Sequence, residues 1–379
     1  METIFYNSFF ISCVLFAVII NYALCRVNFY KHIDFSGSRY YHIDGIRGLA
    51  AIFVVMNHAV FSFTNNGFDP QSIKNENFWV FAHAGDIGVQ IFFCITGFLF
   101  IDKIIKTKNN IEWLGFFVSR VKRLVPLYFI ASTIVLILTL NWATGEQPFI
   151  DTVRQAINLY GFGFMGADIW VNGFRTYSLN AVIWTLPYEW RFYCALPIIC
   201  AFLAYRKFII PAIIIVGLYA LNDLYSGQVV WVYFISGATA AYLLNNVSVH
   251  KLISNDNISA QIIYALVVIS ILLFLLNSSF SGYGYERFLI TSILFIFIVL
   301  TKPKFLTFKP LVYLGEASYS SYLLHLIINA LMVRLISRFI NLNNVSSFEF
   351  YSIIALLVAV TTYVTAYSFK YVEFRFLKK

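Results

Sequence analysis

Long apolar runs are the feature that most limits what this chain can fold into. A transmembrane helix needs about twenty consecutive apolar residues, and eleven segments reach or approach that length. Only 12% of the 379 residues are charged, against about a quarter in soluble proteins. We therefore predict an all-α fold, a polytopic bundle of transmembrane helices. The segments are 4–25, 44–63, 86–102, 122–141, 180–204, 208–221, 229–245, 259–276, 287–301, 311–334 and 348–370.

The distribution of Lys and Arg predicts the orientation of these segments, because basic residues gather in cytoplasmic loops. If residues 26–43 are cytoplasmic, alternation assigns twenty of the 27 basic residues to that side. The seven on the other side are Lys74, Arg154, Arg175, Arg191, Arg287, Arg334 and Arg338. We predict a multi-pass protein of the plasma (inner) membrane, with its N-terminus outside and its C-terminus in the cytoplasm. The same loops account for the net charge of +9, so we predict no nucleic-acid partner.

The first apolar segment is predicted to stay in the protein as an anchor. A signal peptide has a basic start and a small-residue cleavage site, whereas this chain begins Met1-Glu2-Thr3 and has no such site after Cys25. We predict an anchor helix and basic cytoplasmic linker over 1–39, and a membrane domain over 40–379. The five cysteines are odd in number and lie in or beside apolar runs, which favours unpaired packing residues.

The second segment carries ionisable residues, which are costly inside a membrane and often functional. Arg47 and His58 are eleven residues apart, about 20° beyond three helical turns, and Asp44 lies about 40° from register with His58. All three therefore share one helix face. We expect an Asp44–Arg47 ion pair at the cytoplasmic mouth and His58 about 16 Å further along the axis, near mid-bilayer. Gly45 and Gly48 predict a thinned stripe, a channel for an elongated substrate.

Two further clusters are basic or acidic. Arg120 and Arg123 share a face at i,i+3 and suit phosphate binding, although ordinary loop charge also explains them. Trp184 and Glu189 stand near the predicted outer end of the fifth segment, where Glu189 either serves a site or pairs with a neighbouring cation. The outside loop at about 142–178 is either a lid, an acceptor-binding surface or a loop packed on the membrane.

The last cluster lies in the tenth segment. Tyr319, Tyr322 and His325 follow an i, i+3, i+6 stripe, with His325 deep in the predicted span. This stripe either faces the same cavity as His58 or forms a separate network between helices.

Taken in order, these motifs resemble the acyltransferase type 3 family of integral-membrane acyltransferases. The family hallmark is an Arg and a His separated by ten residues on one helix, as Arg47 and His58 are here. The stretch 88–98 is similar to the family's second-helix motif, with Thr96 where a Ser is common, and 120–128 is similar to its basic third-helix motif. The resemblance runs from about residue 40 to 375. It departs at Glu373-Phe374-Arg375, which lacks the proline of the family's usual Glu-x-Pro.

This resemblance implies a fold of about ten core helices, here with one extra N-terminal helix. It also implies transfer of an acyl group, most often acetyl, from cytoplasmic acyl-CoA to a glycan hydroxyl. The acyl-CoA would be a co-substrate, and we expect no metal and no bound cofactor. The catalytic residues would be His58, Asp44 and Arg47. His58 would be the general base or would itself accept the acyl group. Arg120 and Arg123 would bind the donor with help from Arg47, which Asp44 would orient. The residues expected on the acceptor side or in support are Trp184, Glu189, Tyr319 and His325.

The sequence leaves the acceptor open among lipopolysaccharide O-antigen, capsule, exopolysaccharide, a common glycan of the enterobacterial type, peptidoglycan precursor and small glycosides. Expected partners are membrane lipids, acyl-CoA, the glycan or its lipid-linked precursor, and proteins of polysaccharide assembly. With no soluble hydrolase-like domain after the last segment, we expect the chemistry to finish in the membrane domain or with a separate partner. Two other functions stay open: a transporter or flippase that uses the polar stripe as a proton relay, and a scaffold with a degenerate site.

Overall fold

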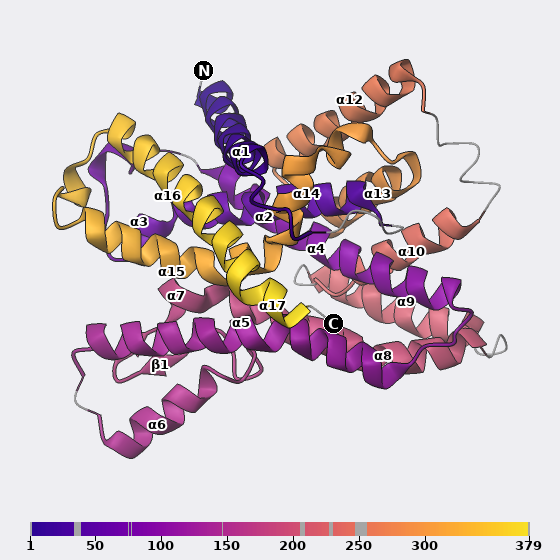
Figure 1. Cartoon of the computed structure of the whole chain (residues 1–379), viewed down its shortest axis with the longest axis horizontal. Helices are drawn as coiled ribbons and strands as arrows, with labels where there is room; N and C mark the ends of the chain where they lie inside the picture. Colours follow the sequence, from indigo (N-terminus) through magenta and orange to yellow (C-terminus); the bar gives the residue numbers. More distant parts are fainter. Residues whose placement is uncertain are drawn as a thin grey trace.

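The computed structural model describes residues 2–33, 39–74, 76, 78–145, 147–204, 209–226, 230–246 and 256–377. Within these residues the regular structure is helical apart from one short hairpin (Figure 1). Seven of the described helices are long and apolar enough to cross a membrane. The predicted all-α, polytopic fold is confirmed. Of the basic residues predicted on the cytoplasmic side, Arg206, Lys207, Lys251, Lys378 and Lys379 lie outside the described residues.

Each predicted apolar segment falls on a helix or on a pair of helices. The long elements are α1 (Glu2–Arg26), α2 (Tyr41–Val60), α4 (Trp79–Lys106), α5 (Trp113–Trp142), α8 (Leu186–Ala204), α9 (Ile209–Ser226), α10 (Tyr233–Asn245), α12 (Ile258–Asn277), α13 (Tyr285–Thr301), α14 (Lys309–Glu316), α15 (Ser318–Ile336) and α16 (Ser347–Ser368). Residues 208 and 229, where two predicted segments begin, lie outside the described residues.

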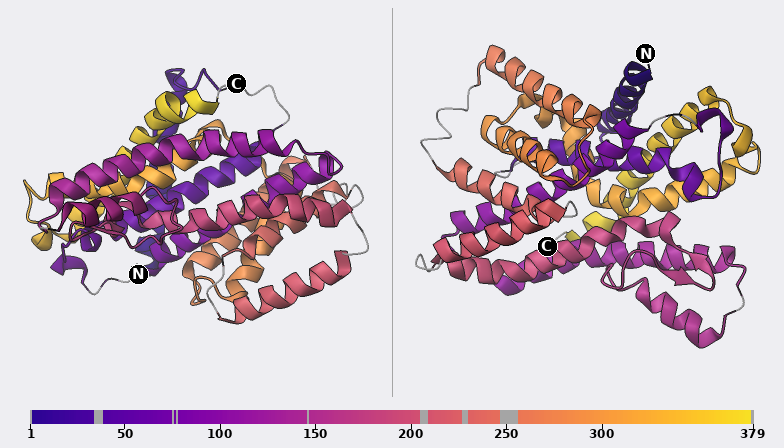
Figure 2. Two further views of the ribbon diagram at one scale, coloured as in Figure 1. Left: turned by 90° about the horizontal axis from the view of Figure 1, so that it is seen from below. Right: turned by 180° about the vertical axis from the view of Figure 1, so that it is seen from behind.

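Short elements connect or extend these helices. They are α3 (Ser62–Asn65), η1 (Gln71–Ile73), α6 (Phe149–Asn158), β1 (Trp170–Val171), β2 (Phe174–Arg175), α7 (Tyr177–Asn180), η2 (Ala181–Thr185), η4 (Lys304–Thr307), η5 (Leu342–Asn344), the π-helix η6 (Phe369–Glu373) and α17 (Phe374–Leu377). Strands β1 and β2 pair in an antiparallel hairpin. Beside it, hydrogen bonds from Arg175 hold the pKa of Asp168 below its usual value. Helix α6 stands apart at the edge of the molecule (Figures 1 and 2).

Helix α2 lies at the centre, in contact with α1, α4, α14, α15 and α16. Its glycines explain the close approach of the chain beside it. A Cβ on Gly45 would overlap the carbonyl of Leu306, and one on Gly48 would overlap the carbonyl of Leu311. The predicted glycine-thinned channel is therefore wrong, because the backbone before and within α14 fills the space that these glycines leave.

The tenth predicted segment, 311–334, is two helices rather than one. The chain breaks between α14 and α15 at Ala317. Arg47 of α2 donates a hydrogen bond from Nε to the carbonyl of Gly315 at 2.8 Å, one of the carbonyls that the end of a helix leaves without a partner. The guanidinium thus donates to a carbonyl at the break between the two helices, and the break brings Glu316 close to Arg47.

Residues 158–185 return along α5 rather than lying wholly beyond it. The hydroxyls of Tyr128 and Ser132, in the second half of α5, both donate to the carbonyl of Leu159, at 2.7 and 3.1 Å. The ring of Phe162 stacks on Tyr128 with centroids 4.0 Å apart. Helix α8 therefore starts beside the middle of α5, with Pro187 in its first turn, where a missing N–H costs nothing.

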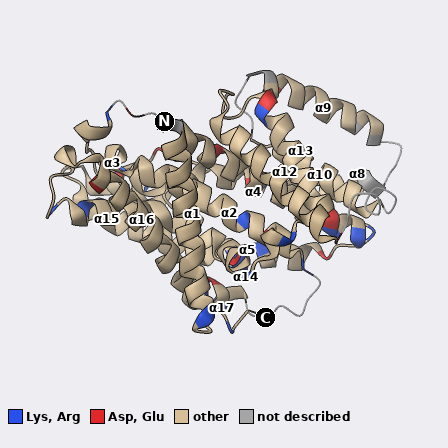
Figure 3. Ribbon diagram, turned by 90° about the horizontal axis from the view of Figure 1, so that it is seen from above, with Lys and Arg blue, Asp and Glu red and all other residues tan. Residues whose placement is uncertain are grey.

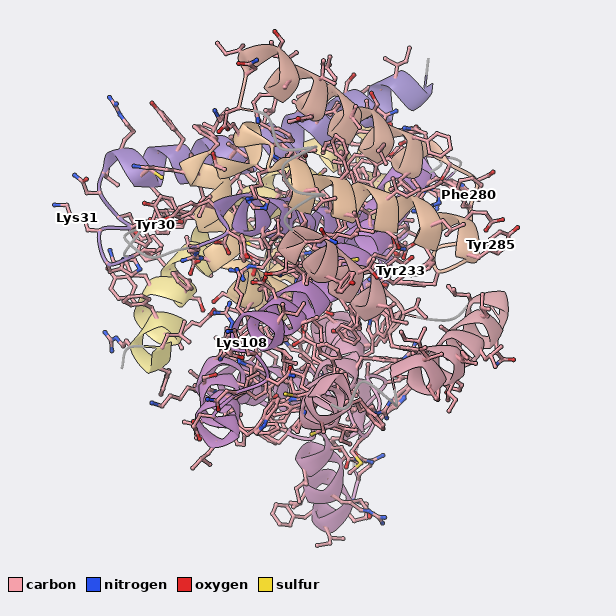
Figure 4. All side chains as sticks on the ribbon, turned by 90° about the vertical axis from the view of Figure 1, so that its right-hand side faces the viewer. Tyr30, Lys31, Lys108, Tyr233, Phe280 and Tyr285 are labelled. Carbon is pink, nitrogen blue, oxygen red and sulfur yellow. The ribbon has the colours of Figure 1, made fainter. Side chains whose placement is uncertain are left out.

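Charged residues are sparse over most of the molecule, and several lie at its centre where α2, α5 and α14 meet (Figure 3). Figure 4 shows Lys31 and Lys108 towards one end of the bundle, and Phe280 and Tyr285 at the other, with Tyr233 between. Lys31 and Lys108, which alternation assigns to one side, thus lie towards the same end. This arrangement is that of a multi-pass membrane protein.

Candidate active site

His58 contacts a second histidine. It lies in the last turn of α2, which ends at Val60. Its Nδ1 is 3.1 Å from Nε2 of His325 in α15, and the ring centroids are 4.9 Å apart. Of the two alternatives that the sequence left for the stripe on α15, the structure thus shows that His325 shares a site with His58.

Backbone carbonyls determine where the protons of the two histidines lie. His325 Nδ1 is 2.8 Å from the carbonyl of Ser321, and His58 Nδ1 is 3.0 Å from the carbonyl of Val54. A carbonyl can only accept, so in the neutral rings both Nδ1 atoms carry the proton. His325 Nε2 then accepts from His58 Nδ1–H. This assignment leaves His58 Nε2 with a lone pair, and it has no hydrogen-bond partner in the part of the chain that the structure describes.

Arg47 lies at the other end of α2 in a network of charges. Its Nη2 is 3.4 Å from Asp44 and 3.8 Å from Glu316. Arg39, just before the helix, pairs with the same two carboxylates. The predicted Asp44–Arg47 pair is present, and it fixes the guanidinium within a buried network that also contains Glu316.

A cavity of about 110 Å³ lies between α4, α5, α8 and α15, and Arg47 is part of its wall. The cavity brings together residues that the sequence analysis selected separately, including those predicted to bind the donor and two of those predicted for the acceptor side. Its polar lining residues are Arg47, Thr96, Arg120, Arg123, Thr185, Glu189, Tyr193, Ser318, Tyr319 and Tyr322.

Arg120 and Arg123 lie inside α5, two to three turns after its start. Helix α5 begins nine residues earlier than the predicted segment, at Trp113, so these arginines are within the helix rather than at its entry. The guanidinium of Arg120 lies over the ring of Phe100, 5.3 Å from the centroid. Because both arginines line the cavity, they present two cations to whatever enters it.

Glu189 lines the same cavity as the arginines. It accepts a hydrogen bond from the hydroxyl of Tyr193 at 2.9 Å. The sequence analysis placed it at the outer end of its span. In the structure, residues 158–185 run back along α5, so α8 starts beside α5 rather than beyond its end. Glu189, near the start of α8, therefore lies beside Arg120 and Arg123 of α5.

Tyr319 lines the cavity, whereas Trp184 lies next to a lining residue. The hydroxyl of Tyr319 donates to the carbonyl of Leu124 at 2.7 Å, which ties α15 to α5. Trp184 is half-buried and makes edge contacts with the rings of Tyr188 and Tyr283, at 6.2 and 6.3 Å between centroids. It is not part of the cavity wall, but the next residue, Thr185, is.

The sequence reasoning missed two carboxylates of the site. Glu373, 2% exposed, lies 3.7 Å from Arg123 and accepts a hydrogen bond from Ser320 at 3.0 Å. Glu316 joins the network of Arg47. Both are ionisable residues at the edges of apolar segments. Because burying a charge in a membrane costs free energy, their position in the sequence could have identified them as candidates.

Comparison with known proteins agrees with this picture. Residues 40–364 match the model of the acyltransferase domain of type 3. The O-acetyltransferases OatA of Staphylococcus aureus strains NCTC 8325 / PS 47 and COL are each 26% identical over 325 residues, covering 75% of this chain and 49% of the relative. The chain thus spans about half the length of the curated relatives it matches. No solved structure matches. Since the family model covers most of the chain, this protein belongs to the acyltransferase type 3 family of membrane acyltransferases.

Proposed function

We propose that this protein is an O-acyltransferase, most simply an O-acetyltransferase. It would move the acyl group of a cytoplasmic acyl-CoA to a hydroxyl of a cell-surface polysaccharide or its lipid-linked precursor. One observation carries this proposal: His58 is held as the tautomer with a free Nε2, against His325, which follows Tyr322 by one helical turn, and Tyr322 lines a cavity together with three arginines. The relatives named O-acetyltransferase support the acetyl group as the one transferred.

His58 supplies the base in this reaction. Its Nε2 takes the proton of the acceptor hydroxyl while the oxygen attacks the thioester carbonyl. When the carbon–sulfur bond breaks, the CoA thiolate leaves and takes that proton from the imidazolium. His325 accepts from Nδ1–H throughout, so it orients the ring and stabilises the cation that forms. In the alternative route, Nε2 attacks the thioester carbonyl, the carbon–sulfur bond breaks and the CoA thiolate leaves. The acceptor hydroxyl then attacks the acyl-imidazolium, its proton goes to the thiolate, and the carbon–nitrogen bond breaks to return the neutral imidazole.

The arginines supply the donor site. A CoA thioester carries phosphates, which guanidinium groups bind through charge-assisted hydrogen bonds. On α5, Arg120 and Arg123 would bind a phosphate in the cavity. On α2, Arg47 lines the same cavity and is oriented by its ion pair with Asp44. Tyr322 lines the cavity together with the arginines, and His325 follows it by one helical turn on α15. Helix α15 therefore leads from the proposed donor site to the histidines. The orientation predicted from loop charge puts the arginines on the cytoplasmic side.

Mass spectrometry of surface glycans tests this function. We compare cells with the wild-type protein, with His58→Ala, and without the gene. We expect an acetyl increment only with wild type, because general-base catalysis contributes about 10²–10⁴-fold to such a rate. The matched control is His83→Ala: His83 is also a buried helical histidine bonded to a carbonyl, that of Leu276 at 3.0 Å. Acetylation retained by His58→Ala, or identical glycans in all strains with the protein present, would contradict the proposal.

A further inference from the structure

Asn329 of α15 is a buried side chain with unused hydrogen-bonding capacity. It is 1% exposed, and neither its Nδ2 nor its Oδ1 finds a partner in the described residues. Buried polar atoms are nearly always paired in folded proteins, since an unpaired one loses its bonds to water. A buried amide with neither of its groups paired therefore indicates a role other than helix packing.

Asn329 continues the face of α15 that forms the site. Ser318, Tyr322, His325 and Asn329 follow at i, i+4, i+7 and i+11, so they lie within about 60° of one another. Ser318 and Tyr322 line the cavity, and His325 contacts His58. Asn329 lies about 6 Å beyond His325 along the axis, on the side away from the arginines. It is thus on the side from which an acceptor would reach His58 under the proposed function.

A second asparagine comes from the element packed against this part of α15. Helix α7 contacts both α15 and α3, the short helix that follows α2 and His58. Just after α7, Ala181 and Val182 pack on Leu326, which is in the turn between His325 and Asn329. Asn180, at the end of α7, is 8% exposed, and its Oδ1 also lacks a partner in the described part of the chain. Two neutral amides therefore lie on neighbouring elements beyond the histidines.

The chemistry of these amides indicates what they bind. An amide offers N–H donors and a carbonyl acceptor side by side. A phosphate or carboxylate would use the donors and leave Oδ1 unpaired, and a hydrocarbon would pair with nothing. Hydroxyl groups both donate and accept, so neighbouring hydroxyls of a sugar satisfy the whole amide.

We infer that Asn329, with Asn180, binds hydroxyl groups of the acceptor beside the one that is acylated at His58. The ligand class is a neutral polyhydroxylated sugar unit. This inference rests on the proposed function and extends it, because it names residues that select the acceptor rather than the donor.

The test separates transfer to a sugar from hydrolysis. The purified full chain is given acetyl-CoA and, as the probe, envelope glycan from cells that lack the gene. Acetyl transfer is measured by mass spectrometry, and hydrolysis by thiol release without glycan. For Asn329→Leu, which has a similar volume but no polar atoms, we expect the ratio of transfer to hydrolysis to fall about 10–100-fold, the usual effect of losing hydrogen bonds to a substrate hydroxyl. We also expect the variant to unfold at a higher temperature, since two unpaired atoms are gone.

Asn21→Leu is the matched control. Asn21 is likewise 1% exposed in a helix, but its Nδ2 donates to the carbonyl of Ala17 at 3.2 Å and its Oδ1 accepts from Tyr30 at 2.5 Å. We expect this variant to be less stable and to keep the wild-type ratio.

An unchanged ratio in Asn329→Leu would overturn the inference and leave Asn329 a packing residue. If that variant does not fold, Asn180→Ala must show the same selective loss, and an unchanged ratio there overturns the inference instead. Failure of the proposed function would look different: the wild-type protein would neither transfer nor hydrolyse acetyl groups, or His58→Ala would do both.

Discussion

The two ends of α2 are built on different electrostatic principles. At the arginine end, side chains of both charges lie together: Arg39, Arg47, Arg120 and Arg123 with Asp44, Glu189, Glu316 and Glu373. At the histidine end, the two rings bond to each other and to backbone carbonyls. The comparison teaches that one helix can hold charge where a charged donor would bind and keep a neutral base where a proton must move. Charges in a low-dielectric interior need partners, whereas a neutral imidazole needs only an acceptor for its N–H.

The largest expected effect is at the arginine end and concerns folding. Arg47→Met removes the cation between Asp44 and Glu316 and the donor to the carbonyl of Gly315. Breaking a buried ion pair by deleting one partner costs about 3–5 kcal/mol, so we expect little folded protein. The measurement is the monodisperse yield in detergent and the unfolding temperature.

Arg39→Met is the control for this prediction, because Arg39 is more exposed than Arg47 and contacts the same carboxylates. We expect it to lower stability less. Wild-type stability in Arg47→Met would show that the network does not depend on its central cation, and the contrast between the two ends of α2 would then lose its basis.

The next effect is at the histidine end and concerns rate. His325→Leu removes one of the two acceptors of His58 Nδ1–H, leaving the carbonyl of Val54, and losing such an orienting partner typically costs about 10–100-fold in activity. We expect a lower kcat with an unchanged KM for acetyl-CoA, because the proposed donor site is at the arginines and not at His325. His325→Gln keeps an acceptor oxygen and should recover part of the loss. A rise in KM with unchanged kcat would instead place His325 in donor binding.

Local periodicity explains what the sequence could predict of this site. The shared face of Asp44, Arg47 and His58 follows from 100° per residue and is present in the structure. The same rule puts Gly45 about 200° and Gly48 about 100° from Arg47, so both glycines could have been assigned away from the face of Arg47, on the side where the chain of η4 and α14 packs on them.

Contacts between distant segments could not be predicted in this way. His58 and His325 are 267 positions apart, and nothing in the two segments alone determines that they meet. The position of Glu189 depends on the return of residues 158–185 along α5, which hydrogen bonds from Tyr128 and Ser132 fix. Such side-chain bonds to a loop carbonyl have no periodic signature, so a hydropathy pattern places the start of α8 at the membrane surface instead.

The smallest effect is again at the arginine end and concerns donor binding. Arg120→Gln keeps a polar side chain with an N–H donor but shortens it and removes one cation from the cavity wall. A charge-assisted hydrogen bond is worth about 1.5 kcal/mol or more, so we expect KM for acetyl-CoA to rise about tenfold with kcat nearly unchanged. The measurement is thiol release at varied acetyl-CoA. Lys122→Gln, an exposed cation in the same turn of α5, should leave KM at the wild-type value. If both variants raise KM equally, the arginine end attracts the donor by general surface charge, and the cavity arginines have no special part in holding it.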